Sequence, residues 1–138
     1  MKPEINFYAV EEDIVKAMAP ILLKIIDDNK RAIIFVKGDD SIKKIDDSLW
    51  TYGRNKFIPH ATIFDKDFVA KDQPILISNQ EDNINKADYL IFLDEPNIEF
   101  IQSFSRSFHF FENSSPCKII KPNNFYRKID GKWQKIAN

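Results

Sequence analysis

The chain has 138 residues, of which 43% are hydrophobic and 30% are charged, and its formal net charge is −1. This length and balance are typical of one globular domain with a sizeable core and exclude a disordered chain. The apolar runs are too short to span a bilayer, and the N-terminus lacks the layout of a signal peptide. We therefore expect a cytoplasmic protein that does not associate with membranes.

Several classes of cofactor are excluded by what the sequence lacks. The single cysteine, Cys117, excludes an internal disulfide, and no cluster of Cys and His has the spacing of metal ligands. Only three glycines are present, and neither a Walker pattern nor a G-x-G-x-x-G pattern occurs. We expect no metal site and no cofactor.

The charges are distributed unevenly. From Ser114 to the end there are six basic residues and one acidic residue, so this segment carries +5 and the preceding 113 residues carry −6. An acidic body disfavours strong binding to nucleic acid, because affinity there rises with the number of phosphates neutralised. Direct nucleic-acid binding would require the basic segment to form one continuous stripe, and a small anionic partner is the alternative.

Strand and helix patterns alternate along the first half of the chain. Residues 5–10 are rich in aromatic and β-branched side chains, which predicts a strand. Apolar residues then recur at helical spacing over 14–26, with Pro20 inside the pattern. A continuous apolar run at 32–36 predicts a central strand, and a second helix buries Ile42, Ile45 and Leu49.

The second half predicts more strands and one further helix. Strands are expected at 74–78, 89–93 and 117–120. A helix is expected to open at Pro96 or Asn97, with Ile98, Ile101, Phe104 or Ser105, and Phe108 on one face, and with His109 after Phe108. A terminal hairpin joins Phe125–Ile129 to Trp133–Ile136 across Asp130-Gly131. The alternation indicates an α/β domain with a mainly parallel sheet and a small antiparallel addition, in one domain over 1–138.

The stretch Leu49–His60 (L-W-T-Y-G-R-N-K-F-I-P-H) carries an unusual density of apolar residues for a loop. Trp50 either plugs the core under the second helix, which we favour, or is exposed. Phe57, Ile58 and Pro59 are harder to bury, because the residue before a proline is extended and loops lie on the surface. Flanked by Arg54 and Lys56, this loop is predicted to be an anchor for a partner protein.

Catalytic residues are not obvious. His60 after a proline is more typical of a hydrogen-bonded structural residue than of a catalyst. Asp46 and Asp47 point about 100° apart on a helix and cannot share a proton or a metal, so a solvated helix face is preferred. His109 is expected to be half-buried and Cys117 inert. The remaining alternative is a small hydrolase or phosphotransferase that uses His60 with a distant carboxylate.

A second constellation of residues lies near the C-terminus and allows two interpretations. One is a solvated basic strand edge that deters pairing between sheets. The other is a groove for an acidic peptide or a C-terminal carboxylate, with tyrosine as its apolar floor. The residues concerned are Lys118, Lys121, Tyr126, Arg127 and Lys128.

Together these segments resemble a known family. Asp46-Asp47-Ser48-Leu49-Trp50, followed by Phe57-Ile58-Pro59-His60, resembles the chi subunit of bacterial DNA polymerase III. Phe7-Tyr8, Gln73 to Ile77, and Tyr126-Arg127 with the later Gly131 are similar to other landmarks of that family, so the likeness covers nearly the whole chain.

The resemblance implies a three-layer α/β/α fold and a non-catalytic accessory subunit that binds no nucleotide. Chi subunits link the clamp loader, through the psi subunit, to the acidic C-terminal tail of single-stranded-DNA-binding protein. The resemblance assigns the psi contact to Trp50, Phe57, Ile58 and Pro59, and the tail contact to Lys118, Lys121, Tyr126 and Arg127.

One departure from the family pattern and the uneven occurrence of psi bear on these partners. Many relatives have a basic helical segment before the tyrosine–arginine pair, whereas this chain has Lys121-Pro122-Asn123-Asn124, and Pro122 does not fit a helix interior. Psi is also not found in every lineage that carries chi, so an equivalent clamp-loader component is the alternative partner.

Overall fold

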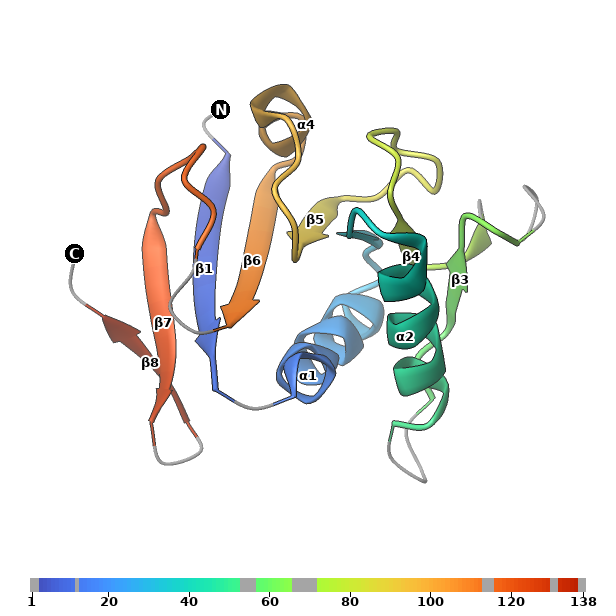
Figure 1. Ribbon diagram of the computed structural model, residues 1–138, viewed down its shortest axis with the longest axis horizontal. Coiled ribbons are helices and arrows are strands. Elements are labelled where there is room, and N and C mark those ends of the chain that lie inside the picture. Colours follow the sequence, from blue (N-terminus) through green and yellow to red (C-terminus); the bar gives the residue numbers. More distant parts are fainter. Residues whose placement is uncertain are drawn as a thin grey trace.

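The computed structural model describes residues 3–11, 13–52, 57–65, 72–112, 116–129 and 132–136. Within these residues eight strands form one sheet in the order β3-β4-β2-β5-β6-β1-β7-β8 (Figure 1). The strands are β1 (Glu4–Val10), β2 (Ala32–Phe35), β3 (His60–Thr62), β4 (Ile75–Ser78), β5 (Tyr89–Phe92), β6 (Arg106–Glu112), β7 (Asn124–Ile129) and β8 (Lys132–Ile136).

The sheet is parallel from β3 to β7, and β8 pairs antiparallel with β7. Strands β2 and β4 are buried at every position, because both of their faces are covered. The mixed sheet and the C-terminal hairpin are confirmed, while the predicted turn residues Asp130 and Gly131 lie outside the described residues.

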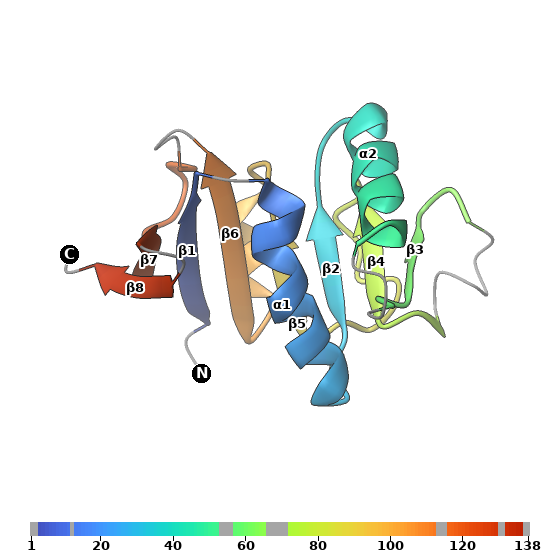
Figure 2. The same cartoon turned by 90° about the horizontal axis from the view of Figure 1, so that it is seen from below.

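One face of the sheet is covered by α1 (Ile14–Asp27) and α2 (Asp39–Trp50), which lie beside each other in Figure 2. The carboxylate of Asp13 accepts hydrogen bonds from the backbone N–H groups of Val15 and Lys16, so it caps α1. The two helices bury their apolar stripes against each other and the sheet, among them Met18, Leu22, Ile42 and Leu49. Pro20 lies on the exposed side of α1 and does not end it.

The opposite face is covered by the short helix α4 (Ile98–Gln102) and by irregular segments. Phe100, Ile101 and Phe104 pack there against strand residues such as Phe35 and Phe92, and Cys117 and Ile120 join the edge of this cluster. The chain therefore forms three layers, with a helix layer on each side of the sheet, and the expected α/β/α architecture is confirmed.

Two element predictions were wrong, and one strand was missed. The helix expected from Pro96 to Phe108 ends at Gln102, and Phe108 and His109 belong to β6, which pairs with both β5 and β1. The strand expected at 117–120 is a series of bends, because β1 already has β6 and β7 as its two neighbours. The short edge strand β3, which begins at His60, was missed.

Candidate partner-binding site

Two aromatic side chains form an exposed apolar patch where α2 ends and the chain enters β3. Trp50, the last residue of α2, is 56% exposed, and Phe57 is 63% exposed. Their ring centroids lie 5.6 Å apart. We call this pair the aromatic patch. The preference for Trp50 as a core plug is therefore wrong.

Ile58, next to Phe57, points the other way. Its side chain is 0% exposed and belongs to the core cluster formed by α1, α2 and the sheet. The expectation that Ile58 is a surface anchor is corrected, because a fully buried side chain has no surface to offer a partner. Pro59 is half-buried, and the predicted flanking residues Arg54 and Lys56 lie outside the described residues.

The buried residue His60 packs against Trp50 of the aromatic patch. Its side chain is fully buried, and its ring centroid lies 4.7 Å from that of Trp50. Nδ1 lies 2.7 Å from the carbonyl oxygen of Ile58, and Nε2 lies 2.8 Å from Oδ1 of Asp46 on α2. The ring thus fastens the loop to α2 and contacts the indole of Trp50 at an interplanar angle of 51°.

This arrangement favours a structural role for His60. Both ring nitrogens are engaged by protein oxygens, so neither faces a substrate. His60 is not among the residues that line the cavities beside the first turn of α1 or the cavity beside Arg31. The hydrolase alternative required a pocket that contains His60 beside a carboxylate, whereas the described surface at this point carries the exposed rings of the aromatic patch.

Sequence reasoning missed the partner of His60. Asp46 and Asp47 were assigned together to a solvated helix face, which holds for the exposed Asp47 and is wrong for Asp46. Asp46 and His60 are 14 positions apart in the sequence, and helix periodicity does not connect them. The available signal was the D-x-x-L-W … F-x-P-H pattern itself, because its first and last residues are Asp46 and His60.

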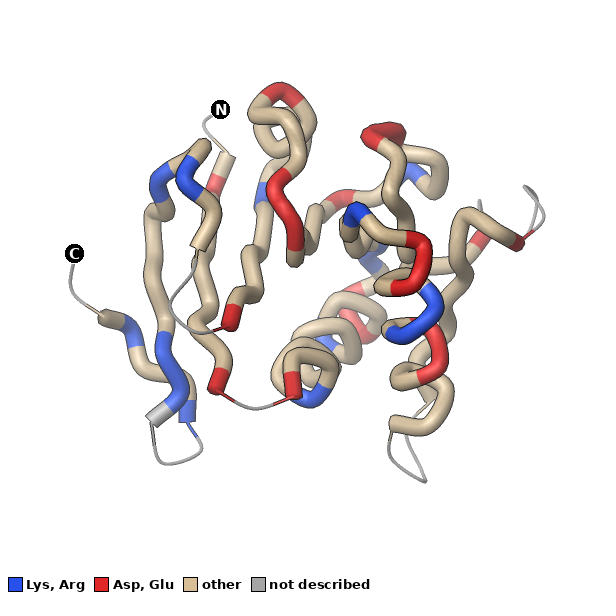
Figure 3. The backbone as a smooth tube through the Cα atoms, viewed as in Figure 1, with Lys and Arg blue, Asp and Glu red and all other residues tan. Residues whose placement is uncertain are grey.

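The basic residues near the C-terminus do not converge on one point. Lys118 and Lys121 are exposed on the segment before β7, which is not helical over residues 116–123. Figure 3 shows the basic positions of this part of the chain in two groups, one before β7 and one toward the end of β7 and on β8. They do not form one continuous stripe across the described residues.

Tyr126 and Arg127 lie on opposite faces of β7, since successive side chains of a strand alternate. The Tyr126 ring stacks on Tyr8 of β1, with centroids 5.0 Å apart, and Arg127 is exposed. Burial, and to a smaller extent the electrostatic effect of the nearby Tyr126, raises the pKa of Tyr8 to about 12. Tyr126 is thus part of an aromatic row within the sheet, and Arg127 is the accessible member of the pair.

Within the described residues, no group of three or more His, Cys, Asp or Glu side chains is placed to hold a metal ion. No helix in that part of the chain is long and apolar enough to cross a membrane.

The open, mostly parallel sheet and its exposed aromatic patch define an α/β protein with a surface suited to a protein partner. The family model for the DNA polymerase III chi subunit, HolC, matches residues 1–130, and the chain belongs to this family. A probable DNA polymerase III subunit chi from Rickettsia prowazekii (strain Madrid E) is 29% identical over 150 residues, which cover 95% of this chain and 90% of the relative. The chain accordingly has an accessory role in DNA replication with the DNA polymerase III complex.

Proposed function

We propose that the chain is a non-catalytic adaptor that links the clamp loader, through psi or an equivalent component, to the acidic C-terminal tail of single-stranded-DNA-binding protein. It acts in the cytoplasm as a single domain, without a cofactor. The observation that carries the proposal is the aromatic patch: two large apolar rings are exposed to solvent, and one of them, that of Trp50, contacts the buried ring of His60, whose two nitrogens each lie within hydrogen-bond distance of an oxygen. Such rings typically supply most of the binding energy at protein interfaces.

The clamp-loader contact is assigned to Trp50 and Phe57, with Pro59 at its border. Phe57→Ala should abolish co-purification of clamp-loader components from the native cytoplasm and leave the free energy of unfolding nearly unchanged. A suitable control is Phe64→Ala, because Phe64 is 60% exposed and its ring has no contact with the aromatic patch among the described residues. Unchanged capture by Phe57→Ala would remove this assignment.

The second contact is assigned to the C-terminal region, first to Arg127, and then to Lys118, Lys121 and Tyr126, which do not converge with Arg127 on one point. Arg127 is exposed, and a guanidinium binds a carboxylate through two parallel hydrogen bonds. Glu95, whose Oε2 lies 3.3 Å from the backbone nitrogen of Lys118, adds a negative charge nearby, so we rank Lys118 lowest.

A synthetic acidic tail peptide of single-stranded-DNA-binding protein tests this second site by fluorescence anisotropy. Arg127→Ala and Lys121→Ala should each weaken binding, whereas Lys30→Ala, which removes an exposed lysine between α1 and β2, should not. Equal affinity in all four proteins would mean that the tail binds elsewhere or not at all.

A further inference from the structure

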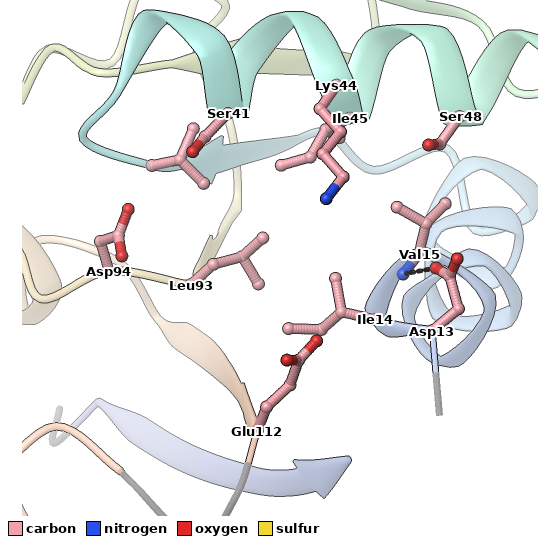
Figure 4. A pocket seen from close by; sticks show the side chains of 11 residues that line it. Asp13, Ile14, Val15, Ser41, Lys44, Ile45, Ser48, Leu93, Asp94 and Glu112 are labelled. Atoms are coloured by element: carbon pink, nitrogen blue, oxygen red, sulfur yellow. Dashed lines mark hydrogen bonds between the residues drawn. The ribbon is translucent and has the colours of Figure 1, made fainter. Parts of the chain in front are cut away.

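A groove separate from the aromatic patch lies between the first turn of α1 and one face of α2. Figure 4 shows it at the carboxyl ends of the strands, where Leu93 and Asp94 follow β5 and Glu112 ends β6. Its cavity measures about 430 Å³. Open parallel sheets commonly bind ligands in this crevice, but the family resemblance gives it no role.

The electrostatics of the groove exclude the phosphate ligands that such crevices often hold. Where a phosphate would meet the N-terminus of α1, the Asp13 carboxylate already accepts the N–H groups of Val15 and Lys16, at 2.8 and 3.4 Å. Asp94 and Glu112 add two further carboxylates, against one cation, Lys44, among the described residues that line the groove. An anion would therefore be repelled, and a cation attracted.

The shape and the lining of the groove indicate which kind of cation fits it. Ile14, Ile45 and Leu93 provide apolar walls, and the carboxylates lie at the rim (Figure 4). The Asp94 carboxylate is held in place because its Oδ2 accepts the backbone N–H of Lys37, at 2.8 Å. Among the described residues, Glu112 forms no ion pair with Lys44. An aliphatic stem that ends in a planar guanidinium fits these features, and guanidinium is also easier to desolvate than ammonium.

The groove leads toward the aromatic patch. A second cavity of about 360 Å³ shares Asp13, Val15 and Ser48 with the first and is bordered by Thr51 and Tyr52, which directly follow Trp50. A chain segment that covers Trp50 can therefore continue along α2 into the groove.

We propose that the groove binds an arginine side chain of the protein segment that docks on the aromatic patch. The inference rests on the proposed function for the identity of the partner, but the groove itself can be tested without any partner. The probe is Nα-acetyl-arginine amide, and Nα-acetyl-citrulline amide serves as its neutral isostere. Methyl NMR signals of Ile14, Val15 and Leu93 report occupancy of the groove.

Arginine amide should shift these signals in a saturable, salt-sensitive manner, and citrulline amide should not. Asp94→Asn and Glu112→Gln should each weaken the response by about two- to fivefold, as for a partly exposed ion pair. Lys44→Met should strengthen it by a similar factor, because the competing cation is removed. Glu99→Gln, which neutralises an acid in the helix layer on the other side of the sheet, is the matched control.

Equal shifts with arginine and citrulline amides, or none, would overturn the inference, as would a stronger response to spermidine, which would indicate a free polyamine. Trp50→Ala should leave the arginine response intact. If clamp-loader capture survives Phe57→Ala while arginine amide still binds, the proposed function fails and the groove does not. If arginine amide binds but the Asp94→Asn, Glu112→Gln double variant captures the clamp loader normally, the groove does not serve that partner.

Discussion

Each ring nitrogen of His60 faces an oxygen atom, and this limits which atom can donate in each of the two hydrogen bonds. The carbonyl oxygen of Ile58 can only accept, so Nδ1 must donate. Nε2 then either donates to an ionised Asp46 carboxylate or accepts from a protonated one. In both cases Asp46 completes the hydrogen bonding of a ring that water does not reach.

Two substitutions of Asp46 distinguish the loss of its hydrogen bond to His60 from the loss of its charge alone. Asp46→Ala leaves Nε2 without a partner and should lower the free energy of unfolding by about 1–3 kcal/mol. Asp46→Asn should cost less, since its amide N–H can donate to Nε2 of a neutral ring. Urea denaturation measures both, and Trp50 fluorescence should change more in the alanine variant. Asp47→Ala, exposed one residue away, should change stability by no more than about 0.5 kcal/mol. Equal losses for Asn and Ala would contradict the hydrogen-bond account.

His109 gives a prediction about pH. Burial lowers its pKa, against the opposing hydrogen bond to Phe92, and its Nε2 accepts the backbone N–H of Cys117. The unfolded chain therefore binds a proton that the folded chain resists, so this residue's contribution to stability is lost as the pH falls below about 6.5.

The slope from one such proton is at most about 1.4 kcal/mol per pH unit. Urea midpoints between about pH 7 and 5 measure it. His109→Gln, which cannot titrate, should depend less on pH over this range than the natural chain. The same slope in both proteins would show that other groups cause the acid sensitivity.

At the scale of elements, the sequence predicted the strands that are continuous apolar runs and the helices with a clear stripe. It failed at β6 because a strand that is covered on both faces does not alternate, and Phe104 and Phe108 happen to fit helical spacing. It also could not tell which of Phe57 and Ile58 faces outward. That choice depends on how α1 and α2 pack against a loop far from α1 in the sequence.

Helix α1 contains a proline, Pro20, that weakens the helix and can be replaced. Pro20 has no N–H, so the carbonyl of Lys16 lacks its intrahelical partner, and the exposed position leaves room for alanine. Pro20→Ala should raise the free energy of unfolding by about 2 kcal/mol, that is, the propensity gain of about 3 less about 1 for a freer unfolded chain. Thermal unfolding checks this, and the exposed Lys24→Ala in the same helix is the control. Destabilisation by Pro20→Ala would mean that the proline is needed where it lies.

At the scale of the molecule, the two proposed contacts lie at opposite ends of one sheet. The aromatic patch adjoins β3, and Arg127 lies on β7, next to the other edge (Figure 1). With neighbouring strands about 4.8 Å apart, the six intervals from β3 to β7 separate the two contacts by roughly 29 Å. This exceeds the screening length of about 8–10 Å at moderate salt, so the sites should act independently.

Independence and salt response can be measured together. Tail-peptide affinity should be the same with and without the clamp-loader partner bound. Raising the salt from about 0.05 to about 0.5 M should weaken the tail contact more than the aromatic one, because screening acts on charges. Isothermal titration calorimetry of each pair and of the ternary complex gives these values. Equal salt sensitivity at both sites would indicate that the patch is not the dominant clamp-loader contact.

The pairing of β1 has a consequence for biosynthesis. Among the described residues, the strands that pair with this first strand are β6 and β7, and Glu4 lies opposite Arg106. Until that residue has left the ribosome, an aromatic-rich strand has no native neighbour, and contacts so distant in sequence form slowly. The nascent chain therefore exposes an aggregation-prone apolar segment for most of its synthesis. Its yield in a cell should depend on chaperone capacity more than its final stability would indicate.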